Sequence, residues 1–208
     1  MGVEALVPFA AFWLVAIFMP GPNTLLFTWI ALSQPRDVAV ATVAGILSCT
    51  TLWGLAGLFG LIWATARFPS AYHAVKMAGG LYLVWRGGML LYGAVAGPGV
   101  PWHVGDRLGP LTRARAFRLG FLTNLSNAKS FAFVTSLFAS TQIARGPLWL
   151  GLTGVALMVA MSACWYATLL VLFGSPAFVD GYRRARRLIE GVAGTIFMAL
   201  GTEMAFGG

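Results

Sequence analysis

The sequence predicts an all-α polytopic membrane protein whose six transmembrane helices form two inverted three-helix repeats, with helices 1 and 4 interrupted. Hydrophobic residues make up 59% of the 208 residues. Charged residues make up 10%, against roughly 25% in a typical soluble domain. Six apolar runs are separated by segments rich in proline and glycine, and polar residues break the first and the fourth run.

The apolar runs, read against their breakers, give six candidate spans. They cover about 5–32, 38–66, 72–93, 118–140, 148–173 and 188–206. The separating segments contain Gln34-Pro35, Phe68-Pro69, Gly97-Pro98-Gly99, Gly146-Pro147 and Ser175-Pro176. About 20 apolar residues cross a bilayer as a helix, so the first two spans are long enough to predict tilt, a break or an interfacial extension.

The distribution of Lys and Arg predicts the orientation of the chain. Alternate loops, the first, third and fifth, hold Arg36, then Arg107, Arg113, Arg115 and Arg118, then Arg183, Arg184, Arg186 and Arg187. The other two loops hold Arg67, Lys76 and Arg145. The positive-inside rule then places both termini outside the cytoplasm. The chain is thus expected to form one transmembrane domain over 1–208, with repeat 1 at about 5–93, a cytoplasmic linker at about 94–117 and repeat 2 at about 118–206.

The positions of the Lys and Arg residues also indicate how the net charge of +8 is to be interpreted. Because the basic residues lie in short loops between spans, they favour contact with anionic lipid head groups, and nucleic-acid binding is not expected. The isolated residues Cys49 and Cys164 lie in apolar surroundings and predict packed small side chains.

Two local matches support the division into repeats. The matching segments are 80–87 with 194–201, and 58–60 with 172–174, both at the same offset. A polar run at 124–129 also stands in the fourth span about where 20–23 stands in the first. With three helices in each repeat, the second repeat enters the membrane from the opposite side.

The first break is Pro20-Gly21-Pro22-Asn23, in a stretch without charge between Glu4 and Arg36. Prolines and glycine remove or loosen backbone hydrogen bonds that lipid cannot replace. Such a break is stable only when it is buried in protein or lines a watery cavity. In transporters, breaks of this kind mark the binding site.

The second break carries Asn124, Asn127 and Lys129. Lys129 falls near the middle of the bilayer, where a charge is costly and usually functional. Its position predicts a side chain that binds a ligand in a cavity. The alternative is a structural role, in which the lysine donates to a backbone carbonyl that the helix break leaves unpaired. The asparagine amides can hold a polar ligand, or they can cap half-helices.

The acidic residues fall in loops or toward helix ends, so no carboxylate is expected near the midplane. A lysine, amides and helix N-termini suit a carboxylate ligand, and they fit a zwitterion better than a metal or a dibasic solute. The sequence has no catalytic, nucleotide or metal motif, so no enzyme activity, cofactor or metal is predicted.

At these residues the chain resembles the LysE/RhtB family of bacterial amino-acid exporters. The resemblance lies in Met19-Pro20-Gly21-Pro22-Asn23, in the segment 79–87 and in the segment 117–129. It implies export of an amino acid driven by the proton motive force, with the two broken helices meeting at the binding site. One departure is Ala128, where the family usually has proline, and it predicts a less pronounced break in that helix.

The sequence and the resemblance together predict a multi-pass efflux transporter of the bacterial inner membrane. Its site residues would be Pro20, Gly21, Pro22, Asn23, Asn124, Asn127 and Lys129. Its partners would be a small amino acid or close derivative, protons and the lipid bilayer. A homodimer is left open. The alternatives are a carrier of another small metabolite or ion and a membrane partner protein that does not transport.

Overall fold

The computed structural model describes residues 3–18, 21–67, 71–96, 109–141, 143–173 and 176–206. Within these ranges the chain forms helices and no β-strand, which confirms the predicted all-α class. The α-helices are α1 (Leu6–Phe18), α2 (Pro22–Ser33), α3 (Arg36–Arg67), α4 (Ala71–Ala96), α5 (Arg113–Leu125), α6 (Ala128–Ser140), α7 (Leu148–Leu172) and α8 (Pro176–Phe206). Two short 3-10 helices cover Val3–Ala5 and Ile143–Arg145.

Two of the described helices are long and apolar enough to cross a membrane, α3 over Arg36–Trp63 and the whole of α7. The pair α1 and α2, bent by 55° at the break between them, would make a third span if counted together. By contrast, α5 and α6 have 13 residues each, fewer than the roughly 20 that a span requires. Six spans therefore remain a prediction.

The last helix begins earlier than predicted. A span was expected at 188–206 after an arginine-rich loop, but α8 begins at Pro176, so Arg184 and Arg187 lie on the helix. Proline is favoured in the first helical turn and arginine is a good helix former, so this segment continues the helix although it is polar. The predicted linker at 94–117 is likewise narrower, because α4 continues to Ala96 and α5 begins at Arg113.

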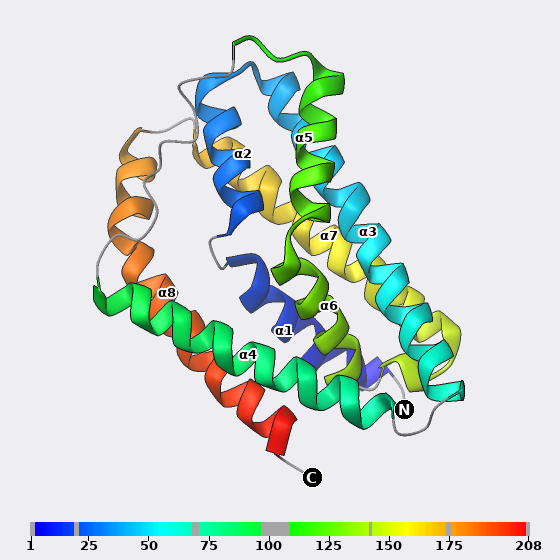
Figure 1. Ribbon diagram of the computed structural model, residues 1–208. Coiled ribbons are helices and arrows are strands. Elements are labelled where there is room, and N and C mark those ends of the chain that lie inside the picture. The colour runs from blue at the N-terminus through cyan, green and yellow to red at the C-terminus, as the bar shows by residue number, and fades with distance from the viewer. Residues whose placement is uncertain are drawn as a thin grey trace.

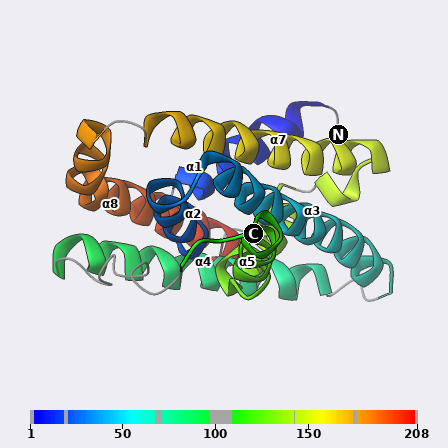
Figure 2. The same cartoon turned by 90° about the horizontal axis from the view of Figure 1, so that it is seen from above.

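The long helices α3 and α7 extend past both broken helices, and α4 packs along α8 (Figure 1). Figure 2 shows α7 and α4 on opposite sides of the molecule, with α2 between them. Many large apolar side chains on these helices face outward, including Trp63, Val171 and Leu188, which are 66%, 74% and 71% exposed. Exposed apolar surface of this extent is typical of a face that meets lipid.

Two separate clusters of buried apolar side chains form the core. The α1–α6 cluster includes Phe9, Phe12, Trp13, Leu58, Leu83, Phe133, Leu137, Phe138, Ile143, Leu150 and Met158. The α2–α5 cluster includes Leu26, Phe27, Ile30, Val38, Ala39, Ile46, Leu111, Ala116, Tyr166, Leu169 and Phe173. Each broken helix therefore contributes one half to each cluster, whereas α3 and α7 contribute to both.

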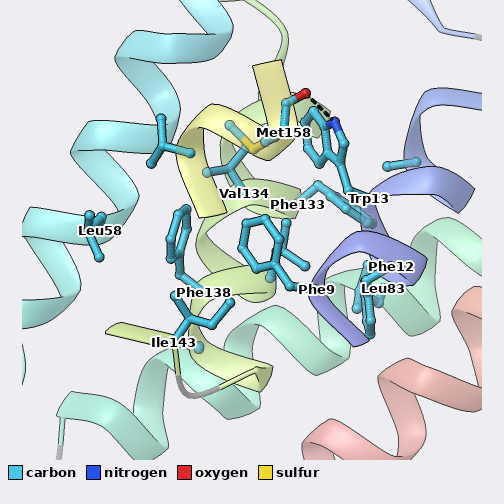
Figure 3. Close-up of a cluster of buried hydrophobic side chains, with 14 of the residues drawn as sticks. Phe9, Phe12, Trp13, Leu58, Leu83, Phe133, Val134, Phe138, Ile143 and Met158 are labelled. Carbon is cyan, nitrogen blue, oxygen red and sulfur yellow. Dashed lines mark hydrogen bonds between the residues drawn. The ribbon is translucent and has the colours of Figure 1, made fainter. Parts of the chain in front are cut away.

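Aromatic rings fill the α1–α6 cluster (Figure 3). Phe9 meets Phe138 edge-on, with ring centroids 5.2 Å apart, a favourable arrangement for aromatic pairs. The indole N–H of Trp13 donates to the carbonyl oxygen of Met158 at 2.9 Å, so this buried polar group is satisfied.

Close backbone contact joins α3 to α5. A Cβ atom on Gly120 would overlap the carbonyl oxygen of Thr42, and one on Gly45 would overlap that of Phe117. Small residues allow helices to approach this closely, which is a common way to pack helices in membranes. This contact fixes the helix before the second break against a helix that is continuous.

We expect Gly120→Ala to destabilise the protein, because the added methyl group must separate α3 from α5. Overpacking of this kind costs about 1–3 kcal/mol. The matched control is Gly60→Ala in α3, where no atom lies within 4 Å of the added Cβ and where alanine favours the helix. Thermal unfolding of the two detergent-purified variants is the measurement. Equal melting temperatures would contradict the assigned contact.

Candidate functional site

A polar cavity of about 60 Å³ lies between the two breaks. Its described lining residues are Trp13, Ala16, Ile17, Gly21, Asn23, Thr24, Ile46, Thr50, Trp53, Asn124, Asn127, Ser130, Phe133, Val134, Ser162, Trp165 and Tyr166. The apolar lining residues come from both core clusters, so the cavity lies on the boundary between the two clusters. Drug-sized pockets measure about 300–1,000 Å³, so this volume suits a small solute or a few water molecules.

The first break places the start of α2 at the cavity. Gly21 precedes this helix in an extended conformation, and Pro22 is its first residue, where its missing N–H costs nothing. No side chain caps the helix, and the first N–H groups of a helix lack acceptors within it. Gly21 and Asn23 both line the cavity, so the positive end of the α2 dipole lies beside it. Pro20 lies outside the described residues.

The second break is present although Ala128 stands in place of proline. Helix α5 ends at Leu125 and α6 begins at Ala128. The carbonyl oxygen of Asn127 accepts the N–H groups of Ser130 at 2.9 Å and Phe131 at 3.3 Å, so Asn127 starts the new helix. Asparagine is strongly preferred at that position, which explains why the helix restarts without a proline. The expectation that this break is less pronounced than the first stays a prediction.

Asn124 connects the two breaks to α3. It is 1% exposed. Its Nδ2 donates to the carbonyl oxygen of Ile46 and to the hydroxyl of Thr50, each at 2.9 Å. Its Oδ1 accepts from Nδ2 of Asn23 at 2.9 Å, and its backbone carbonyl accepts from the indole of Trp53 at 3.2 Å. Both amide hydrogens and the amide oxygen of Asn124 are thus used within the protein.

These bonds determine how the amide of Asn23 is oriented. The carbonyl oxygen of Ile46 can only accept, so Asn124 must turn its NH₂ group toward Ile46 and its oxygen toward Asn23. Asn23 must then donate to Asn124, which directs its own oxygen away from that partner. The Oδ1 atom of Asn23 is buried without a hydrogen-bond partner at the cavity.

A second unpaired polar atom belongs to the same lining. Nε1 of Trp165, on α7, is buried without a hydrogen-bond partner. Among the described side chains, it and Oδ1 of Asn23 are the buried nitrogen and oxygen atoms without a partner. Buried polar groups are normally paired, so an acceptor and a donor left open at one cavity indicate a site for a polar ligand.

The sequence-predicted site residues are thus partly brought together. Gly21, Asn23, Asn124 and Asn127 line the cavity, and Pro22 begins α2 beside it. Lys129 is the second residue of α6 and precedes the lining residue Ser130, but its side chain lies outside the described part of the structure.

Sequence reasoning missed Trp165, as well as Trp53 and Thr50 on α3. A tryptophan or threonine within an apolar run carries no local signal of function. Only the fold shows that these side chains face the breaks.

The described lining residues carry no formal charge. The described part of the chain also holds no group of three or more His, Cys, Asp or Glu side chains that could bind a metal ion. An amide oxygen, an indole N–H and a helix N-terminus can together bind a small molecule with both an ammonium and a carboxylate group.

Comparisons with known proteins identify the family of the chain. The family model described as "LysE type translocator" matches residues 14–208. The threonine efflux protein of Escherichia coli (strain K12) is 30% identical over 195 residues, which cover 92% of each chain.

Two further relatives are also efflux proteins. The homoserine/homoserine lactone efflux protein of Salmonella typhimurium (strain LT2) is 29% identical over 89% of this chain and 88% of its own. The leucine efflux protein of Enterobacter sp. (strain 638) is 25% identical over 94% of this chain and 91% of its own. No solved structure matches significantly. The resemblance found in the sequence motifs is confirmed, and the chain belongs to the LysE family of translocators, which are transporters and not enzymes.

Proposed function

We propose that this protein exports a small amino acid or close derivative across the bacterial inner membrane, using the polar cavity as its binding site. The observation that carries the proposal is the pair of unpaired atoms, Oδ1 of Asn23 and Nε1 of Trp165, on two residues that line one cavity whose described lining has no formal charge. The relatives named as threonine, homoserine and leucine efflux proteins support an amino acid as the substrate.

The geometry suggests how each end of a zwitterion is held. The amide oxygen of Asn23 accepts from the ammonium group, because this atom is left open by the bond to Asn124. The carboxylate accepts from the indole N–H of Trp165 and lies near the N-terminus of α2, where the helix dipole favours negative charge. Asn124 positions Asn23 and does not itself contact the substrate.

The walls of the cavity then select the side chain of the substrate. Phe133, Val134 and Ile46 provide apolar surface, whereas Thr50 and Ser162 provide hydroxyl groups. No described lining residue offers a charge of either sign, so a charged side chain would be desolvated without a partner. A short neutral side chain, aliphatic or hydroxylated, fits this lining best.

Lys129 is proposed to complete the carboxylate site. It belongs to the first turn of α6, directly before the lining residue Ser130. A lysine near the middle of a bilayer is costly unless it is compensated, and a bound carboxylate would compensate it.

The proposed architecture is six spans in two inverted repeats with both termini outside. The pairing of α4 with α8 supports it, since a Cβ on Gly87 would lie 2.7 Å from the carbonyl oxygen of Gly194, and one on Gly194 would lie 2.9 Å from that of Gly87. Gly80 and Gly201 make the equivalent reciprocal contact. Exchanging the two repeats converts one contact into the other, as a two-fold relation requires.

The two core clusters suggest how the site could open to each side in turn. The cavity lies between clusters that share only continuous helices, so a shift of one cluster against the other would open one side of the cavity. The proton motive force is the proposed energy source, as the family resemblance implies.

The function is tested by efflux from cells. Cells that express the chain should retain less of a loaded neutral amino acid, such as threonine, homoserine or leucine, than cells that carry an empty vector. They should also grow at inhibitory concentrations of that amino acid. Dissipating the proton gradient should abolish the difference. A screen of all the common amino acids that shows no efflux above the vector would overturn the proposal.

The roles of the cavity side chains are tested with Trp165→Phe, which keeps an aromatic ring and removes the N–H. A hydrogen bond to a charged group is worth about 1.5–3 kcal/mol, so KM for export should rise roughly ten- to hundredfold. Trp149→Phe is the matched control on the same helix, where the side chain is 53% exposed and away from the cavity. An unchanged KM for Trp165→Phe would exclude the indole from binding.

Lys129→Met removes the charge and keeps the length of the side chain. A binding role predicts normal abundance in the membrane with lost substrate binding, and Lys129→Arg should recover only weak transport because a planar guanidinium does not replace a compact ammonium. A purely structural role, in which the lysine stabilises the fold by donating to a backbone carbonyl, predicts instead that the Met variant is degraded. Quantitative blotting combined with binding measurements separates these outcomes, and wild-type transport by an abundant Met variant would contradict both.

A further inference from the structure

The side chain of Ser162 is a buried hydroxyl in an apolar helix. Ser162 lies on α7, which is long and apolar enough to cross a membrane, and it is 3% exposed. The threonines of the same helix, Thr153 and Thr168, are exposed. Ser162 is among the residues that line the polar cavity, and neither threonine is. A hydroxyl kept out of water needs hydrogen-bond partners, so its bonds indicate its role.

The fold does not depend on this hydroxyl to satisfy its neighbour. The indole N–H of Trp13 donates to Oγ of Ser162 at 3.0 Å and also to the carbonyl oxygen of Met158 at 2.9 Å. The bond to Met158, drawn in Figure 3, would remain if the hydroxyl were absent. Removing the hydroxyl of Ser162 therefore leaves the buried indole N–H with a partner.

One acceptor position of Ser162 stays open. A hydroxyl has one hydrogen to donate and two lone pairs that accept. Ser162 donates its hydrogen to the carbonyl oxygen of Met158 at 2.9 Å, and one lone pair accepts from Trp13. The second lone pair accepts from no described residue. Ser162 can therefore accept one further hydrogen bond from a ligand.

The hydroxyl of Thr50, which also lines the cavity, has a structural role instead. It donates to the carbonyl oxygen of Ile46 and accepts one amide hydrogen of Asn124, each at 2.9 Å. The other amide hydrogen of Asn124 already binds Ile46. Loss of the Thr50 hydroxyl would therefore leave a buried amide hydrogen without its partner, whereas loss of the Ser162 hydroxyl leaves no such group.

We propose that Ser162 selects the side chain of the substrate by accepting a hydrogen bond from it. The inference rests on the proposed function, in which Trp165 binds the carboxylate and Asn23 the ammonium group. Ser162 and Trp165 are three residues apart on α7, so their side chains lie on one side of that helix. Two other hydroxyl residues of the lining, Thr24 and Ser130, lie on α2 and α6. A small amino acid bound at Trp165 has its side chain within reach of Ser162, where a hydroxyl donates and an aliphatic group cannot.

The test compares threonine with valine, which has a methyl group where threonine has its hydroxyl. Uptake of each labelled amino acid is measured in inverted membrane vesicles that contain the full-length protein. A hydrogen bond between neutral groups changes affinity about two- to tenfold, so the KM of the wild type should be lower for threonine by about that factor. Ser162→Ala should remove this preference. Its melting temperature in detergent should equal that of the wild type, because Trp13 keeps its bond to Met158.

Two further variants serve as controls. Thr168→Ala removes an exposed hydroxyl from the same helix, one that donates to the carbonyl oxygen of Cys164 at 2.8 Å, and it should keep the preference for threonine. Thr50→Val should lower the melting temperature and impair the transport of both amino acids alike, because it leaves a hydrogen of Asn124 unpaired.

Several outcomes would overturn the inference. A wild type that favours valine, or a preference for threonine that survives in Ser162→Ala, would exclude Ser162 from selecting the side chain. An equal rise of KM for both amino acids in Ser162→Ala would assign the hydroxyl to the ammonium group, and a fall in melting temperature would assign it to the fold. A wild type that exports no amino acid would instead contradict the proposed function.

Discussion

The structure depends on satisfying the backbone where two apolar helices are interrupted. Lipid offers no hydrogen-bond partners, so the protein must supply them from its own side chains. At the second break, the carbonyl oxygen of Asn124 accepts from the indole of Trp53 and from the N–H of Asn127. The side chain of Asn124 then binds the carbonyl oxygen of Ile46 on α3 and the side chain of Asn23 at the other break. Because one buried amide holds both breaks against a continuous helix, the cavity between them has a fixed set of walls.

The same hydrogen bonds explain how the described lining of the cavity is polar without a charged side chain. Both amide hydrogens of Asn124 bind within the protein and its oxygen accepts from Asn23, so the oxygen of Asn23, a residue that lines the cavity, is left without a partner. A neutral acceptor of this kind binds an ammonium group without the repulsion or desolvation that a fixed charge of the wrong sign would bring. The site suits a solute that carries both charges itself.

The sequence was sufficient to predict the two breaks and the residues at them. Proline, glycine and asparagine in apolar runs have local physical consequences, so Pro22 and Asn127 begin new helices as expected. The sequence placed Asn23 and Asn124 at the two breaks but did not predict the hydrogen bond between them. The role of Trp165 was not predicted, because only the fold determines whether a buried indole N–H has a hydrogen-bond partner.

The start of α8 was also missed, since a positively charged segment was interpreted as a loop although arginine favours a helix. The number of spans was not settled either, because half-helices such as α5 and α6 are each too short to be recognised as a span.

The separation of the core into two clusters has a consequence for the energetics of movement. Hydrophobic stabilisation is proportional to the apolar area that is buried, about 25 cal/mol for each Å². The buried apolar side chains group in the α1–α6 and α2–α5 clusters, and the cavity is lined by members of both. A shift of one cluster against the other at the cavity would leave the contacts within each cluster in place, so each cluster would keep the apolar area that it buries.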